Sequence, residues 1–434
     1  MKYHSTEGKS PSIDLLTALT NGIAPDGGLY LPETFKPLAD DTLRKMRGLP
    51  FDQVARIIGG HLIGEDLTSA ELDELTHKAL NFEIPLCEYQ KDIHGLELFH
   101  GPTLSFKDIG ARFLSHLLSL LRKKHEKQLY ILVATSGDTG SAVAQGFFKK
   151  EGIQTIILFP SGGVTPLQQS QFATLGGNVH ALEVSGTFDD CQKLVKSAFL
   201  DHDLNQKINL GSANSINVGR LLPQIFYYFH AYAQLTSTEP PLFSVPSGNF
   251  GNLTAGLIAK RLGLPCRGFT AATNMNDIVP EYLRTGHIRV RPSIRTISNA
   301  MDVGNPSNLV RMEYLYERDL NTIRKDIVGS THSDEETRDC IKRIYTSTGK
   351  ILDPHSAIGY LGVEPGVSEF GEGPSIFLMT AHPIKFRETV EQELKCTLQV
   401  PESVSSTLSA TSQTVPIGTD LSELREFLIE KEGD

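Results

Sequence analysis

Short apolar runs alternate with segments of helical character along most of the chain, and this alternation limits what the chain can fold into. The runs lie at residues 129–134, 153–159, 179–184, 242–245, 266–271 and 376–379. Each run is continuous, as is typical of strands buried on both faces, and the segments between them are long enough for crossover helices. The sequence therefore predicts an α/β chain with parallel sheets.

The two ends of the chain differ from this middle part. Residues 1–90 are richer in helix and turn signals, including a predicted helix at 69–80, and are predicted to form a separate N-terminal domain. A main region then spans 91–395, with a smaller lobe at roughly 128–235, and an extension covers 396–434. Within the extension, the Ser-, Thr- and Val-rich stretch 402–416 predicts a loop or an edge strand before a final helix.

The charge balance excludes several classes of function. The 41 Lys and Arg against 51 Asp and Glu leave a net charge of -10, which opposes binding to nucleic acid or to anionic membranes. The charged N-terminus predicts neither a signal peptide nor a membrane span. Five widely spaced cysteines without a paired-ligand pattern predict a reducing, cytoplasmic location. The sequence carries no signal for the oligomeric state.

The sequence around Lys107 predicts a buried amine. Residues 100–108 read HGPTLSFKD, and apolar residues then recur at four-residue spacing, at Ile109, Phe113, Leu117 and Leu121. This spacing places Lys107 in the first turn of a largely buried helix, where burying a charged ammonium group costs free energy. The cost disappears if the amine forms a Schiff base with an aldehyde, and pyridoxal 5'-phosphate (PLP) supplies one together with a phosphate. A solvated surface lysine is the alternative.

A glycine-rich turn after the run at 242–245 offers a place for that phosphate. The turn consists of Ser247, Gly248, Asn249, Phe250, Gly251 and Asn252. Glycines let successive backbone N–H groups converge on an anion, and the helix predicted at 253–262 would add the positive end of its dipole. An ordinary strand-to-helix turn is the alternative. The occurrence of this glycine-rich turn together with Lys107 favours a binding site for the phosphate. Residues 247–252 are called the phosphate cup below.

A second turn of this kind follows the run at 129–134. The hydroxyl and N–H groups of Thr135, Ser136 and Thr139 could hold an anion at the start of the next helix. The alternative is a helix N-cap formed by Thr135 or Ser136.

The histidines do not predict a metal site. The 14 histidines form no ligand cluster in the sequence, so no metal is expected. Residues 353–355 (Asp-Pro-His) are interpreted as a turn, and His382 as a residue that orients a loop.

Six motifs carry a family resemblance. They are DGGLYLP at 26–32, the Lys107 segment, ATSGDTG at 134–140, NSIN at 214–217, the phosphate cup and TAHP at 380–383. With these motifs the chain resembles the long bacterial and fungal threonine synthases, which are PLP-dependent enzymes of fold type II. The resemblance extends to about residue 395 and implies two parallel-sheet α/β lobes with PLP between them, plus an N-terminal domain.

The resemblance also implies roles around PLP. Lys107 would hold the cofactor, the phosphate cup would bind its phosphate, and Asp138 would lie near its phenolic oxygen. Relatives often have an asparagine there, and a carboxylate facing a phenolate requires one of the two to hold a proton. Thr380 would meet the pyridine nitrogen with a neutral hydroxyl, which suits elimination and replacement.

Substrate contacts follow from the same resemblance. The turn with Thr135, Ser136 and Thr139 would embrace the substrate's carboxylate or phosphate. Asn214, Ser215 and Arg220 lie at the start of a helix predicted to run to about Ala233 and would hold the substrate's phosphate, a task that suits a planar guanidinium. Without the resemblance, Arg220 would be interpreted as a surface arginine.

The implied activity is conversion of O-phospho-L-homoserine and water to L-threonine and phosphate, the last step of threonine biosynthesis. Two alternatives remain open. A related phospho-lyase would share nearly all the motifs and release a 2-oxo acid and ammonia. A catalytically silent PLP-binding protein would keep the fold, although the intact Lys107, phosphate cup and Thr380 argue against it.

Overall fold

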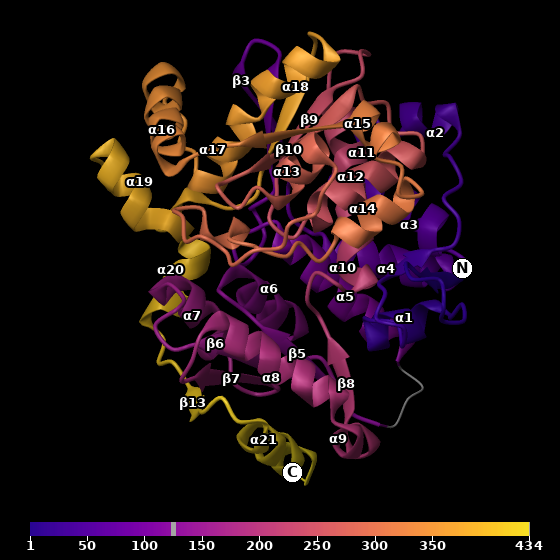
Figure 1. Ribbon diagram of the computed structural model, residues 1–434, viewed down its shortest axis with the longest axis vertical. Coiled ribbons are helices and arrows are strands. Elements are labelled where there is room, and N and C mark those ends of the chain that lie inside the picture. Colours follow the sequence, from indigo (N-terminus) through magenta and orange to yellow (C-terminus); the bar gives the residue numbers. More distant parts are fainter. Residues whose placement is uncertain (123–126, 434) are drawn as a thin grey trace. The chain divides into compact units, whose positions relative to one another are not determined.

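The computed structural model describes residues 1–122 and 127–433, which form two compact units. Unit 1 contains Met1, Leu31–Phe106 and Leu221–Gln399, and unit 2 contains Lys2–Tyr30, Lys107–Arg220 and the chain from Val400 onward. Each unit is built around its own sheet (Figure 1).

Unit 1 contains a six-stranded sheet in the order β11-β10-β9-β12-β4-β3. Its strands are β3 (Leu86–Gln90), β4 (Ile93–Glu97), β9 (Leu242–Pro246), β10 (Gly268–Thr273), β11 (Ile327–Thr331) and β12 (Ser375–Met379). Only the hairpin of β3 and β4 is antiparallel among these pairs. All residues of β9, β10 and β12 are buried, which explains their continuous apolar character.

The helices of unit 1 surround this sheet. They are α2 (Asp40–Lys45), α3 (Phe51–Ile63), α4 (Ser69–Ala79), α11 (Gln224–Gln234), α12 (Gly251–Arg261), α13 (Ile278–Thr285), α14 (Leu309–Leu315), α15 (Leu320–Asp326), α16 (Asp334–Thr348), α17 (Pro354–Leu361), α18 (Val363–Phe370) and α19 (Arg387–Leu394). Two short 3-10 helices are η1 (Asn299–Met301) and η2 (Pro383–Phe386). Helices α17 and α18 pack on β9 and β10, and α11 packs between α3 and α12.

Unit 2 contains a five-stranded parallel sheet in the order β13-β7-β6-β5-β8. Its strands are β5 (Leu129–Ala134), β6 (Ile153–Pro160), β7 (Val179–Val184), β8 (Asn209–Ser212) and β13 (Thr414–Ile417). Its helices are α1 (Leu15–Asn21), α5 (Lys107–Leu121), α6 (Asp138–Phe147), α7 (Pro166–Ala173), α8 (Phe188–Leu200), α9 (His202–Lys207), α20 (Glu402–Ser409) and α21 (Leu421–Gly433).

Three further elements are short. They are the strand β1 (Tyr3–Ser5), which pairs with β2 (Tyr30–Pro32), and the helix α10 (Val218–Leu221).

The core of unit 2 shows why its strands are apolar throughout. Alternate residues of β5, Tyr130, Leu132 and Ala134, join one hydrophobic cluster with residues of α8 and α21. Helices α5 and α6 pack against each other, and α6 also packs on β5 and β6. The strands are therefore enclosed by helices, as expected for a parallel sheet.

All six predicted strands are present, and the predicted α/β class is confirmed. The strand predicted at 266–271 begins two residues later, at Gly268, where its pairing with Leu242 of β9 starts. The long helix predicted up to about residue 233 is wrong: α10 ends at Leu221 and α11 begins at Gln224. Pro223 lies at the break, where it lacks an N–H donor and disfavours helix in the preceding residue.

The C-terminal extension also differs from the prediction in part. Residues 402–409 form the helix α20, not a loop or strand, and α20 packs on α7 with Val404 buried. An edge strand does follow, because β13 pairs with β7 at the border of the sheet. The predicted division into domains at 1–90, 91–395 and 396–434 stays a prediction. Among the described residues, no helix is both long and apolar enough to cross a membrane.

Candidate active site

The carboxyl edge of the unit 1 sheet brings the phosphate cup and Thr380 together. Strands β9 and β12 are adjacent and parallel, with Leu242 opposite Ser375. Ser247 and Thr380 each follow directly after their strand, so they emerge at the same sheet edge. Ligands of open α/β sheets bind at such an edge.

The phosphate cup presents backbone donors without partners. The N–H groups of Gly248, Asn249 and Phe250 donate no hydrogen bond within the part of the chain that the structure describes. Phe250 is buried in the left-handed conformation, with φ of 60°, and no side chain caps α12, which begins at Gly251. The first N–H groups of a helix also lack intrahelical partners. The cup therefore offers a cluster of free donors at a helix N-terminus.

The polar side chains of the cup hold its shape. The Ser247 hydroxyl donates to Asn252 Oδ1 at 3.1 Å, and Asn252 Nδ2 donates to the Pro246 carbonyl at 2.9 Å. Asn249 Oδ1 accepts from the Ser307 hydroxyl at 3.1 Å. Anion contacts are therefore left to the main chain, which fits a phosphate group.

Gly248 is required by close packing. A Cβ atom at this position would lie 2.8 Å from Met301 Cα and 3.2 Å from the Ala300 carbonyl oxygen. These atoms belong to η1, so η1 forms a wall of the cup against which only glycine fits.

The segment before Lys107 is fastened to the end of β12. The Phe106 N–H donates to the Thr380 carbonyl at 2.9 Å, and the His382 N–H donates to the Leu104 carbonyl at 3.0 Å. The buried Lys385 donates through Nζ to the Thr103 carbonyl at 2.7 Å. Residues 103–106 and 380–385, which the sequence places far apart, thus lie side by side in unit 1.

Lys107 is the first residue of α5 and faces a carboxylate of the same unit. Its Nζ lies 3.7 Å from Asp138 Oδ2, and the two side chains are 17% and 3% exposed. The opposite charge offsets part of the burial cost that the sequence predicted for the ammonium group. Gln168 Nε2 donates to Asp138 Oδ1 at 2.9 Å and so holds the carboxylate in place.

The turn after β5 is stabilised by Thr135. Its Oγ1 accepts from the N–H groups of Gly137 at 3.0 Å and Gly140 at 2.8 Å. The alternative of a helix N-cap by Thr135 or Ser136 is wrong, because Gly137 is the N-cap residue of α6 and no side chain caps it. Ser136 is exposed and Thr139 is half-buried, so these two side chains remain accessible at the carboxyl edge of the sheet.

The loop after β8 lies next to the turn after β5, since these strands are adjacent and parallel. Asn214 Oδ1 is buried without a hydrogen-bond partner in the described chain, and Ser215 is half-buried. Because an amide can be rotated to exchange its oxygen and nitrogen, Asn214 can present either an acceptor or a donor.

Arg220 is not a surface arginine, as it would have been interpreted without the resemblance. It is 4% exposed, and its Nη1 donates to the Ala213 carbonyl at 2.6 Å. It passes against the first turn of α5, where a Cβ on Gly110 would lie 2.8 Å from its Nε. Burial lowers the pKa of Arg220 to about 10, with nearby Asp108 acting in the opposite direction, so the side chain stays a cation at neutral pH.

Two supporting residues were not predicted from the sequence. Asn217 Nδ2 donates to the carbonyls of Leu19 and Ser212, both at 2.7 Å, and so ties the loop after β8 to α1. Gln168 also closes a capping box with Thr165 at the start of α7. The spacing of Thr165 and Gln168 is typical of a capping box and could have been recognised in the sequence. The contact of Gln168 with Asp138 could not, because no nearby residue indicates it.

His355 and His382, the two histidines interpreted from the sequence, both lie in unit 1. His382 Nδ1 accepts from the Ile384 N–H at 3.1 Å at the start of η2, which agrees with a role in orienting this loop. Burial lowers the pKa of His382 to about 4, and the nearby His100 adds to this effect. The described residues contain no group of three His, Cys, Asp or Glu side chains that could hold a metal ion.

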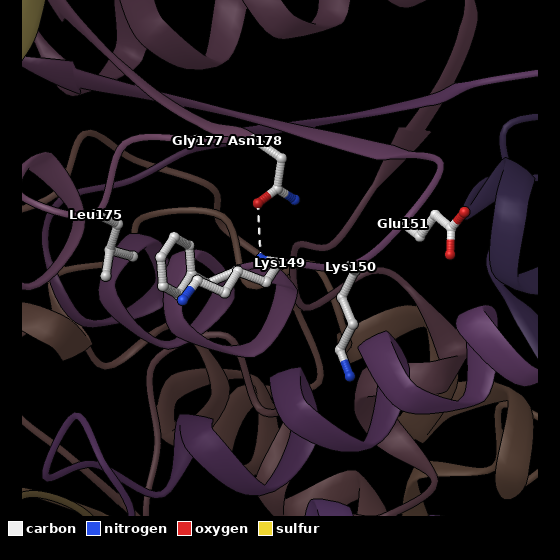
Figure 2. Close-up of a pocket in the computed structure, with 7 residues that line it drawn as sticks. Lys149, Lys150, Glu151, Leu175, Gly177 and Asn178 are labelled. Atoms are coloured by element: carbon white, nitrogen blue, oxygen red, sulfur yellow. Dashed lines mark hydrogen bonds between the residues drawn. The ribbon is translucent and has the colours of Figure 1, made fainter.

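Two surface pockets lie away from the predicted site residues. One, of about 480 Å³, is lined by Phe148, Lys149, Lys150, Glu151, Leu175, Gly177 and Asn178. Figure 2 shows Asn178 bonded to the Lys149 backbone, with Lys150 and Glu151 pointing apart. The other, of about 400 Å³, lies between α12 and α15 of unit 1 and is lined mostly by charged residues. Neither lining includes Lys107, Asp138, Thr380 or a residue of the phosphate cup.

Comparison with known proteins identifies the family. Residues 89–380 match the model of pyridoxal-phosphate dependent enzymes, and residues 2–80 match the model of the threonine synthase N terminus. A threonine synthase of Haemophilus influenzae is 42% identical over 431 residues, covering 99% of this chain and 100% of the relative.

Two solved structures agree with this assignment. The threonine synthase of Escherichia coli has a TM-score of 0.91 at 38% identity and covers 99% of this chain and 100% of its own. The PLP-bound threonine synthase of Brucella melitensis has a TM-score of 0.94 at 34% identity and covers 100% of this chain and 99% of its own. The chain therefore belongs to the threonine synthase family of PLP-dependent enzymes.

Proposed function

We propose that the protein converts O-phospho-L-homoserine and water to L-threonine and inorganic phosphate. The observation that carries this proposal is the similarity to threonine synthases over the full length of the chain. The Cα and Cβ protons are removed as the Cγ–O bond breaks and phosphate leaves, and Cγ gains a proton to become a methyl group. The oxygen of water then forms a bond to Cβ with release of a proton, and Cα regains its proton. No oxidant or reductant is required.

Lys107 is the proposed catalytic residue. Its amine holds the cofactor between turnovers and, when released by the substrate amine, removes the Cα proton and returns protons to the carbon skeleton. Asp138, 3.7 Å away, orients this amine, and Gln168 in turn fixes the Asp138 carboxylate. Asp138 is also proposed to lie near the phenolic oxygen, where it shares a proton.

PLP supplies the aldehyde and the electron-withdrawing ring that acidify the Cα proton. The free N–H groups of Gly248, Asn249 and Phe250 are proposed to hold its phosphate, with Gly251 at the helix N-terminus and with Ser247 and Asn252 maintaining the turn. Thr380 is proposed to meet the pyridine nitrogen. Its neutral hydroxyl leaves the nitrogen without an ionic partner, which favours expulsion of a leaving group.

Two neighbouring loops of unit 2 are proposed to bind the substrate. The turn after β5 takes the carboxylate through the hydroxyls of Ser136 and Thr139, while Thr135 contributes by holding the backbone. Asn214, Ser215 and Arg220 hold the phosphate. Among them, Arg220 supplies the positive charge that a chain of net charge -10 must place locally.

Replacing Arg220 with leucine is expected to lower kcat/KM for phosphohomoserine roughly ten- to hundred-fold, since a charge-assisted contact contributes about 1.5–3 kcal/mol. PLP content should stay normal, as measured by absorbance and by release of the cofactor in alkali. The matched control is Arg425→Leu, which removes an arginine paired with Asp201 elsewhere in unit 2 and should leave kcat/KM unchanged.

Two outcomes would show that Arg220 does not bind the substrate's phosphate. Loss of PLP together with activity would assign Arg220 to folding or cofactor retention. An equal loss of rate with an amino acid that lacks the phosphate would show that the guanidinium does not recognise this group.

Product analysis tests the reaction itself. The purified protein incubated with phosphohomoserine should form threonine and phosphate in equal amounts. Formation of a 2-oxo acid and ammonia in place of threonine would establish the phospho-lyase alternative. Binding of PLP without consumption of substrate would establish the silent alternative.

We also propose the domain division and location that the sequence predicts. The family matches at 2–80 and 89–380 support a boundary near residue 90, with residues 396–434 as an extension. All five cysteines are free thiols in the structure, which supports the cytoplasmic location.

A further inference from the structure

Asp353 and His355 form a buried pair at the start of α17, where the sequence predicted only a turn. Asp353 is fully buried and caps the helix, since Oδ1 accepts from the Ser356 N–H at 3.0 Å and also from the Ser356 hydroxyl. Its Oδ2 accepts from the His355 N–H at 3.0 Å and lies 2.7 Å from His355 Nδ1. Each carboxylate oxygen is therefore engaged by two donors.

The other ring nitrogen of His355 bonds to η1. His355 is 2% exposed, and its Nε2 accepts from the Ala300 N–H at 3.2 Å. Since Nε2 acts as an acceptor, the ring proton must lie on Nδ1, where Asp353 accepts it. A carboxylate thus fixes the tautomer and orientation of an imidazole, and the imidazole holds a backbone N–H.

That backbone N–H belongs to the wall of the phosphate cup. The atoms closest to the position of a Cβ on Gly248 are Met301 Cα and the Ala300 carbonyl oxygen, both in η1. Met301 is 4% exposed and packs with Ala272 of β10 and Ile358 of α17. Movement of η1 would therefore change the space available to Gly248 and the direction of its N–H.

The other side of η1 is held independently. Asp302 Oδ1 accepts from Asn274 Nδ2 at 2.9 Å and from the Thr296 hydroxyl at 2.7 Å, and Asp302 Oδ2 accepts from the Thr296 N–H at 3.0 Å. Asn274 directly follows β10, the neighbour of β9. His355 therefore holds Ala300 in the middle of η1, and these hydrogen bonds hold Asp302, the residue that follows η1.

We propose that Asp353 and His355 are positioning residues that set the wall of the phosphate cup and thereby the affinity for PLP. The pair acts through Ala300 and Met301, the residues of η1 that lie against Gly248. This inference rests on the proposed role of residues 247–252 in binding the cofactor phosphate.

Two substitutions of His355 separate the contact with Ala300 from the contact with Asp353. Glutamine carries its amide oxygen about as far from Cα as Nε2, so His355→Gln can still accept from Ala300. Asparagine is shorter, so His355→Asn can still donate to Asp353 but cannot reach Ala300. Titration of the apoprotein with PLP should show a dissociation constant raised roughly tenfold in His355→Asn, the effect of one lost hydrogen bond of about 1.4 kcal/mol, and within about threefold of wild type in His355→Gln.

A third variant tests the role of the carboxylate. Asparagine is as good an N-cap as aspartate, so Asp353→Asn should keep α17 intact. Its Nδ2 group, however, donates where the carboxylate accepts, which drives the ring proton of His355 to Nε2 and places two donors face to face at Ala300. Asp353→Asn should therefore weaken PLP binding at least as much as His355→Asn, with an apoprotein melting temperature close to that of His355→Gln.

A stability control completes the experiment. Ile58→Val in α3 removes one buried methyl group and costs about 0.5–1.5 kcal/mol of stability without touching the cup. It should lower the melting temperature and leave PLP affinity unchanged. The inference is overturned if His355→Asn and His355→Gln bind PLP equally well, whether both match the wild type or both are weakened to the same extent.

The two proposals fail separately. Release of a 2-oxo acid by the wild-type protein would refute the proposed reaction, while the ratio of PLP dissociation constants among the variants would still decide the role of the pair.

Discussion

Lys107→Ala is expected to lower threonine formation by roughly 10⁴-fold or more, because the variant loses both the covalent attachment of PLP and the group that moves the Cα proton. The wild-type protein reduced with borohydride should carry the reduced cofactor on the peptide that contains Lys107, and the variant should carry none. Steady-state threonine release and peptide mass mapping measure the two effects.

The matched control for Lys107 is Lys149→Ala. Lys149 lies in the same unit, and its ammonium lies 5.0 Å from the centre of the Phe148 ring at the pocket in Figure 2. This variant should retain full activity. A reduced adduct on a different lysine, such as Lys260, would show that the assignment of Lys107 is wrong.

Gly248→Val should raise the PLP dissociation constant roughly a hundredfold or more. The new Cβ would lie 2.8 Å from Met301 Cα, a backbone atom that cannot move aside as a side-chain end can. Overpacking costs about 1–3 kcal/mol, and the shift of the cup removes N–H contacts to the phosphate in addition. Fluorescence or absorbance titration of the apoprotein measures the affinity.

Gly59→Ala is the control for overpacking alone. A Cβ on Gly59 in α3 would lie 3.3 Å from the end of the Leu72 side chain, which can adjust. This variant should bind PLP normally. If Gly248→Val also bound PLP with wild-type affinity, residues 247–252 would not be the site of its phosphate.

Local sequence patterns were sufficient to predict the strands and the glycine cup. The buried strands of parallel sheets are continuous apolar runs, so β5, β6 and β7 could be predicted almost to the residue. The cup could be predicted because glycines between a strand and a helix are typical of a turn whose backbone N–H groups converge on an anion. Pro223 itself indicated a helix break, but the continuous apolar pattern around it favoured the prediction of one long helix.

Other features depend on contacts between distant segments. Helix α20 consists largely of residues with weak helix propensity, and it packs on α7. The burial of Arg220 depends on its passage against Gly110 of α5. The alignment of Phe106 with Thr380 and the support of Asp138 by Gln168 likewise join segments whose sequences carry no sign of each other.

The most direct test of the proposed reaction follows the oxygen atoms. Phosphohomoserine should be converted in water enriched with ¹⁸O, and both products analysed by mass spectrometry. Elimination breaks the Cγ–O bond, so the phosphate should retain its four original oxygens, and water adds at Cβ, so threonine should carry one ¹⁸O in its hydroxyl group. Labelled phosphate together with homoserine, or a 2-oxo acid without threonine, would contradict the account.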